Sequence, residues 1–338
     1  MRARAAGGIA ALVLGAALWS AGPVSAAPTE GAHRTTITAP ERASALRFWT
    51  DARLRSARNL DAPAAATTPS AAPGTTGSAG TSRTGEEVRV APLPAPPSAP
   101  ATASAPALAA SDPAPWTGGG LISTTAGKVF FQNASGGTFA CSATVANADN
   151  KSLVLTAGHC VVDAGTGEVY RNWVFIPGYA NGNRPFGTFT ASALFHLDQY
   201  VSTAGNANYD LAFARLAPLN GRSLGDTVGA QGIAFNSATG REVHSFGYGG
   251  SAAEGNGERL NHCSGVEYPD AGREGSTMWG IDCVQTGGSS GGSFLADFDA
   301  AGGGGYLVGN ISVSAGSSEY HPVLGNEALD LYRRAGAA

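Results

Sequence analysis

Basic residues are scarce and scattered in this sequence. Only 14% of the 338 residues are charged, and 21 Lys+Arg stand against 25 Asp+Glu, which gives a net charge of −4. No segment gathers the basic residues into a dense block. Binding to a phosphate backbone depends on such a block, so we expect no nucleic-acid partner.

Long apolar runs are missing after residue 26. A helix that spans a bilayer needs ~20 mostly apolar residues, and no later stretch approaches that length. Residues 1–26 themselves have the layout of an export signal, because Arg2 and Arg4 precede an apolar run at 9–19 and small residues follow at 24–26. We therefore expect a secreted, extracellular protein without a membrane partner once the signal is removed.

Aromatic residues are absent from 61–115, a segment rich in Ala, Ser and Thr that holds 11 of the 19 prolines. Such a composition cannot bury enough apolar surface to offset the entropy of ordering the chain. We predict that 61–115 is a disordered linker.

The segment before this linker, 27–60, contains one weak helical pattern at 40–60. Pro40 suits a first helical turn, and one side of the helix would carry Ala45, Phe48, Trp49 and Ala52. This helix is too short to fold alone.

Residues 116–338 consist mainly of short β-rich runs broken by Gly, Asn and Asp. The runs are 129–132, 138–146, 152–157, 173–176, 211–216, 242–248, 278–284 and 306–314. Only 326–335 reads as a helix, with Glu327 in its first turn and Arg333 and Arg334 in its last. The pattern predicts one all-β sandwich or barrel unit.

Three short motifs carry reactive side chains: T-A-G-H-C at 156–160, N-Y-D-L-A at 208–212 and G-S-S-G-G-S at 288–293. A serine hydroxyl is a poor nucleophile, so it needs a base and a group that orients the base. His159, Asp210 and Ser290 supply one of each. In a tight turn, the amides of Gly288 and Ser290 could stabilise an oxyanion.

These motifs, in this order, resemble those of the chymotrypsin/trypsin-like serine peptidases. The similarity is closest to the secreted bacterial branch that includes the staphylococcal glutamyl endopeptidases, and it covers roughly 127–335. The resemblance implies two six-stranded antiparallel β-barrels with a C-terminal helix. It also implies a secreted endopeptidase that cleaves polypeptides through an acyl-enzyme on Ser290, with His159 as general base and acid and Asp210 orienting it. A monomer without cofactor is expected.

Four cysteines in an exported chain indicate two disulfides, for which three connectivities exist. The resemblance implies Cys141–Cys160, which would brace the catalytic histidine, and Cys263–Cys283, which would tie the strand before the nucleophile loop to its neighbour.

The sequence departs from the digestive enzymes of this family at Ser289, where they carry an acidic residue that pairs with a newly formed N-terminus. That activation switch cannot operate here. The segment 27–115 instead resembles the pro-regions of secreted bacterial peptidases, so we assign 27–60 as a pro-region, 61–115 as its linker and 116–338 as the peptidase domain of a zymogen.

Substrate preference is predicted from the motif positions around the pocket. Val284 replaces the aspartate of trypsins, which disfavours Arg and Lys. The other pocket wall would be Ser312, Val313 and Ser314. Glutamyl endopeptidases carry a histidine where this chain has Ile311, so acidic specificity stays open through the two serines and His321, and an uncharged side chain is favoured. A shifted alignment would bring Asp282 or Glu319 into the pocket.

Two other functions remain as alternatives. The domain could be catalytically inactive and bind extracellular partners, or it could transfer acyl groups on small esters. The G-x-S-x-G pattern at 288–292 suits the latter, but that elbow belongs between a parallel strand and a helix. The other five histidines lack the paired spacing of a zinc site, so no metal is expected.

Overall fold

The computed structural model describes residues 1–2, 31–60, 85–96 and 112–337. The expected signal peptide lies almost entirely outside the described residues, as do 61–84 and 97–111 of the expected linker. Among the described residues, no helix is both long and apolar enough to cross a membrane.

A closed six-stranded antiparallel barrel forms the first half of 116–338. Its strands are β5 (Ala126–Gln132), β6 (Thr138–Ala146), β7 (Leu153–Thr156), β8 (Arg171–Pro177), β9 (Phe189–Leu197) and β10 (Ala212–Leu216). The order β9-β10-β7-β6-β5-β8 closes because β8 also pairs with β9, with Phe175 opposite Phe189. Alternate side chains such as Val129, Phe131 and Trp173 fill the interior.

The second half is a sheet of seven strands with a smaller sheet of four. The larger one is built on β11 (Gly232–Phe235), β12 (Glu242–Gly247), β13 (Asn261–Val266), β16 (Ser293–Asp299) and β17 (Gly304–Asn310), with β3 (Val88–Val90) and β4 (Ala114–Pro115) at its edges. Its order is β3-β11-β17-β16-β12-β13-β4. The smaller one contains β14 (Tyr268–Pro269), β15 (Trp279–Ile281), β18 (Val313–Ala315) and β19 (Ser318–His321). This differs in detail from a second closed barrel, because β18 and β19 pair apart from the larger sheet and β11 pairs with β17 in parallel.

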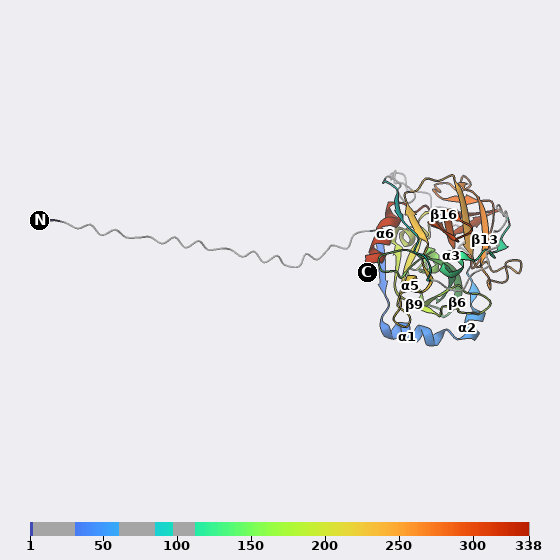
Figure 1. The fold of residues 1–338 in the computed structure, drawn as a ribbon, viewed down its shortest axis with the longest axis horizontal. Helices are drawn as coiled ribbons and strands as arrows, with labels where there is room; N and C mark the ends of the chain where they lie inside the picture. Colours follow the sequence, from blue (N-terminus) through green and yellow to red (C-terminus); the bar gives the residue numbers. More distant parts are fainter. Residues whose placement is uncertain (3–30, 61–84, 97–111, 338) are drawn as a thin grey trace. The chain divides into compact units, whose positions relative to one another are not determined.

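The C-terminal helix α6 (Asn326–Ala337) extends two residues beyond the expected range (Figure 1, red). Its Tyr332 packs on Phe213 of the barrel and on Phe235 of the larger sheet, so the helix joins the two halves. The other helices within 116–337 are short: α3 (Gly120–Thr125), α4 (Asp198–Ser202) and α5 (Leu224–Val228), with single turns η1 (Gly158–Cys160) and η2 (Ala207–Tyr209).

Residues 31–60, which we call the docked leader, lie on the barrel (Figure 1, blue). The single helix expected at 40–60 is two helices, α1 (Ala39–Phe48) and α2 (Asp51–Ser56), because Thr50 caps α2 by accepting from the Arg53 N–H. Strands flank them: β1 (Ala32–Thr36) pairs with β9, and β2 (Arg58–Asn59) pairs with β6.

The described parts of the expected linker are not a free spacer. β3 (Val88–Val90) pairs with β11, and β4 (Ala114–Pro115) pairs with β13. Val88 and Val90 pack on the main core, while the guanidinium of Arg89, on the opposite face, lies over the Tyr306 ring, 4.0 Å from its centroid. In the sequence, β3 is only three alternating residues within a proline-rich segment. An alternation that short does not identify a strand.

Candidate active site

His159 lies in η1, the turn that follows β7, and its side chain is buried. Its backbone N–H donates to Asp210 Oδ1 at 2.8 Å, and its Nδ1 lies 2.7 Å from Asp210 Oδ2. The preceding residue must be small, because a Cβ on Gly158 would lie 3.0 Å from Asp210 Oδ1. The turn therefore places backbone and ring against the same carboxylate.

Asp210 follows η2 and is separated from the barrel strand β10 by the single residue Leu211. The second half of the molecule also holds this aspartate. Ser312 Oγ donates to Asp210 Oδ2 at 2.6 Å, and Asn310 Nδ2 donates to the Asp210 carbonyl at 3.0 Å. The aspartate is thus fixed where the two halves meet.

The contacts of Asp210 determine which ring nitrogen of His159 carries a proton. An ionised carboxylate only accepts hydrogen bonds, so Nδ1 is the donor and the neutral ring presents an unprotonated Nε2. Nε2 is buried and has no hydrogen-bond partner within the described part of the chain. A general base accepts the proton on such an unpartnered nitrogen.

Ser290 lies in the tight turn before β16, against the segment that leads to His159. Gly291 has a φ of 82°, and a Cβ there would lie 2.2 Å from Thr156 Oγ1 and 2.9 Å from the Ala157 nitrogen. Only glycine allows this approach. The structure thus brings the nucleophile turn next to the histidine turn.

Ser142, on β6, holds the turn in place and was not identified from the sequence. Its N–H donates to the Ser290 carbonyl at 2.8 Å, and its hydroxyl donates to the Gly288 carbonyl at 2.8 Å while accepting from the Tyr248 N–H. A serine on a buried strand has no sequence signature that separates it from a packing residue. The Gly288 N–H, one of the two expected oxyanion donors, donates to the carbonyl of Leu60 at 2.9 Å.

Two disulfides join Cys141 to Cys160 and Cys263 to Cys283, the pairs that the resemblance implies. The first connects β6 to the residue after His159. Among the described residues the one group with metal-ligand geometry is Cys141, His159 and Cys160, and both of its sulfurs are in that disulfide.

The residues expected to form the substrate pocket have different environments. Ser312 is fully buried and its hydroxyl is bonded to Asp210, so it does not offer a free donor to an acidic substrate. Val313 is buried, Val284 is half-buried and Ser314 is exposed. The segment expected to form the pocket wall, 312–314, therefore also supports the aspartate, through Ser312.

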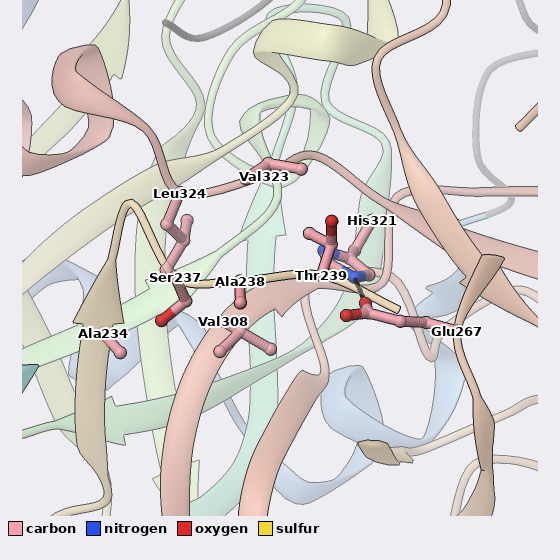
Figure 2. A pocket seen from close by; sticks show the side chains of 9 residues that line it. All are labelled: Ala234, Ser237, Ala238, Thr239, Glu267, Val308, His321, Val323 and Leu324. Carbon is pink, nitrogen blue, oxygen red and sulfur yellow. Dashed lines mark hydrogen bonds and ion pairs between the residues drawn. The ribbon is translucent and has the colours of Figure 1, made fainter. Parts of the chain in front are cut away.

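The side chain of His321 is buried. Its Nε2 lies 3.0 Å from Glu267 Oε2 and its Nδ1 lies 3.1 Å from the Pro322 carbonyl. Figure 2 shows this pair beside a small pocket lined by Val308, Val323 and Leu324. Both ring nitrogens are engaged, so the structure excludes His321 as the group that receives an acidic substrate.

Glu319 is a buried carboxylate directly behind the Val284–Gln285 segment. It accepts from the Gln285 N–H at 3.0 Å and from the Ser245 hydroxyl. Burial raises the pKa of Glu319 to about 7, although these hydrogen bonds oppose the rise. Asp282, the other acidic residue considered for the pocket, accepts from Tyr268 and Ser318 instead.

The raised pKa of Glu319 predicts that the protein loses stability as pH rises. The folded state binds this proton more tightly than the unfolded state does. The contribution of Glu319 to the free energy of unfolding is therefore largest below pH 4.5 and falls until pH passes about 7. The total loss is on the order of 3 kcal/mol. Denaturant unfolding of wild type and Glu319→Gln between pH 4.5 and 8 measures this. The difference in the free energy of unfolding between the two proteins should change with pH. A difference that is the same at every pH would contradict the raised pKa of Glu319.

Comparison with known proteins places the chain in a family. Residues 118–324 match the model of the trypsin family, so the chain belongs to it. The closed barrel, the second sheet and the short C-terminal helix are the chymotrypsin-like fold. No curated protein matches the chain.

Solved structures give two relatives with substantial identity. Protease Anisep from Arthrobacter nicotinovorans is 38% identical with a TM-score of 0.60, and the match covers 64% of this chain and 96% of that one. The thermostable serine protease AL20 from an extremophilic microorganism is 33% identical with a TM-score of 0.58, covering 64% and 99%. A Glu endopeptidase at 18% identity and a TM-score of 0.50, covering 62% and 90%, shares the fold. The chain is thus a trypsin-like serine peptidase.

Proposed function

We propose that this protein is a secreted bacterial endopeptidase that acts through an acyl-enzyme on Ser290. The observation that carries the proposal is the contact of His159 Nδ1 with Asp210 Oδ2 at 2.7 Å, which leaves Nε2 without a hydrogen-bond partner among the described residues. The placement of Gly291 against Thr156 and Ala157 supports Ser290, the residue before it, as the nucleophile.

Each residue would have one role in the reaction. As Ser290 Oγ attacks the peptide carbonyl, His159 Nε2 takes its proton, and Asp210 stabilises the resulting imidazolium. The N–H groups of Gly288 and Ser290 bind the oxyanion. His159 then protonates the leaving amine, and the acyl group stays on Ser290. In the second half of the reaction His159 takes a proton from water, and the water attacks the acyl group. His159 returns the proton to Ser290 as the acid is released.

Secretion and synthesis as a zymogen are part of the same proposal. The export signal expected at 1–26 and the two disulfides support an extracellular protein. The docked leader supports the assignment of 27–60 as a pro-region.

Labelling with a fluorophosphonate tests the proposal, since the reagent phosphonylates a serine only where a working base and oxyanion site activate it. We expect one label, mapped by peptide mass to Ser290. An intact, folded protein that takes up no label after removal of the leader would favour the binding-module alternative. A peptide library would then distinguish endopeptidase activity from hydrolysis of small esters.

We propose further that the enzyme prefers an uncharged side chain at the cleaved position. Val284 supplies no carboxylate to the pocket. The Glu319 carboxylate behind it is fully buried and already accepts from Ser245 and Gln285. A cationic side chain would lose its hydration there without gaining a free partner.

This preference predicts poor cleavage after Arg and Lys. In a matched series of short substrates with Arg, Glu, Leu or Ala at the cleaved position, we expect kcat/KM for Arg to be about a hundredfold or more below that for Leu. A higher value for Arg would refute the argument from Val284 and would indicate that the Glu319 carboxylate is reached. A strong preference for Glu would refute the expected uncharged preference and would indicate that the exposed Ser314 receives the acidic side chain.

A further inference from the structure

The docked leader ends on one of the two groups expected to bind the oxyanion. β2 runs parallel to β6, with Asn59 opposite Ala140, and the next residue continues the contact. The Leu60 N–H donates to the Ala140 carbonyl at 2.9 Å, and the Leu60 carbonyl accepts from the Gly288 N–H at 2.9 Å. Both backbone groups of Leu60 are thus used to bridge β6 and the nucleophile turn.

One backbone N–H makes one strong hydrogen bond, so two acceptors cannot share the Gly288 amide at full strength. While Leu60 holds this donor, a substrate carbonyl meets an oxyanion site that has lost one of its two amides. Mutations that remove such a donor in serine peptidases cost about 10²–10³ in kcat. The contact by itself therefore lowers the reactivity of the triad.

The side chain of Asn59 shows that the fit is shaped around the leader. A Cβ on Gly250 would lie 2.3 Å from Asn59 Nδ2, and a Cβ on Gly257 or Gly288 would lie 2.9 Å from Asn59 Oδ1. Three glycines thus leave the space that Asn59 fills. Asn59 Oδ1 is buried with no hydrogen-bond partner among the described residues, so this oxygen contributes packing and no hydrogen bond.

A second, apolar interface anchors the leader away from the catalytic turn. Trp49 is 3% exposed and packs on Phe130 with ring centroids 5.5 Å apart, while its indole N–H donates to the Asn172 carbonyl. Ala45 and Leu54 are buried in the same cluster. β1 adds an antiparallel strand to β9 over five residue pairs. This anchoring keeps Leu60 at a high effective concentration beside Gly288.

We propose that the docked leader is a tethered inhibitor that blocks the active site by placing the Leu60 carbonyl on the Gly288 amide. The inference rests on the proposed peptidase function and adds its regulation. The surface that the leader covers consists of the edge of β6, the glycines around Asn59 and the cluster around Phe130 that receives Trp49. The segment that covers it is residues 31–60 of the same chain. Activation requires that this segment leave the barrel.

Leu60→Pro tests the block without altering the catalytic residues, because proline removes the N–H that bonds Ala140. Leu60→Ala is the matched control, since it keeps both backbone groups. In the full chain without the signal, with the leader shown intact by mass, we expect initial hydrolysis of a neutral peptide anilide to be at least about tenfold faster for Leu60→Pro than for wild type or Leu60→Ala. Unchanged unfolding temperatures exclude loss of the fold.

Hydrogen exchange gives a readout that does not depend on activity. All chains compared here carry Ser290→Ala, which prevents self-cleavage. The Gly288 amide should exchange slowly in the chain with Leu60 and in the Leu60→Ala variant, and at least about tenfold faster in the Leu60→Pro variant. Equal exchange in all forms would overturn the inference.

The two proposals fail differently. Equal, measurable hydrolysis by wild type, Leu60→Ala and Leu60→Pro would overturn the block and leave the peptidase function standing. Fluorophosphonate labelling of Ser290 to the same extent in all three would do the same. Absence of both hydrolysis and label from Leu60→Pro, with the Gly288 amide shown to be released by exchange, would overturn the peptidase function itself.

Discussion

Ser290→Ala should lower kcat/KM for a peptide substrate by about 10⁴-fold or more and leave the fold intact. The residue supplies the only hydroxyl that the proposed mechanism uses as a nucleophile, and loss of the nucleophile in a triad of this kind removes nearly all of its contribution to the rate. The protein should still be secreted, because the turn is set by glycines and by Ser142 rather than by the Ser290 hydroxyl.

Ser289→Ala is the matched control for this prediction. The Ser289 hydroxyl donates back into its own loop, to the carbonyls of Gln285 and Thr286, and much of the activity should remain without it. Initial rates with a purified preparation, together with the unfolding temperature, decide between the two variants. Residual cleavage by Ser290→Ala above the uncatalysed rate, or equal losses in both variants, would show that the nucleophile is misplaced.

The sequence was sufficient to predict the parts of the site that depend on local chemistry. The motifs around His159, Asp210 and Ser290 each place a particular residue at a particular turn, and their combination in this order is far more specific than any one of them. Most strand positions in the barrel were also predicted, because turns with Gly, Asn and Asp separate the apolar runs. Within 116–338 the strands β9, β11, β13, β14, β16 and β19 were missed. Punctuation does not explain this, because Gly187 precedes β9 and Asp198 follows it.

Contacts between distant segments could not be predicted in the same way. Ser312 was expected in the substrate pocket, and its bond to Asp210 depends on where β17 and β18 diverge, which a single segment does not encode. The bridge from Leu60 to Ala140 and Gly288 joins three segments, each ordinary by itself. The docked leader looked like a weak helix because its partner, the surface around Phe130, supplies most of the apolar contact for Trp49.

Asp210→Asn should reduce kcat by about 10⁴-fold, through the tautomer of His159. Asp210 Oδ1 accepts from the His159 backbone N–H, which can only donate, so the asparagine oxygen takes that place. The amide NH₂ then faces Nδ1 and donates to it. His159 would carry its proton on Nε2, facing Ser290, and could not act as a base.

Ser312→Ala is the matched control, because it removes another hydrogen bond to the same carboxylate but keeps the tautomer of His159. It should therefore cost far less, about tenfold. The pH profile separates the two effects, because Asp210→Asn should regain rate at alkaline pH, where hydroxide or ionised Ser290 replaces the base, whereas Ser312→Ala should keep the wild-type profile. Equal losses with parallel pH profiles would mean that Asp210 acts only by holding the two halves of the molecule together.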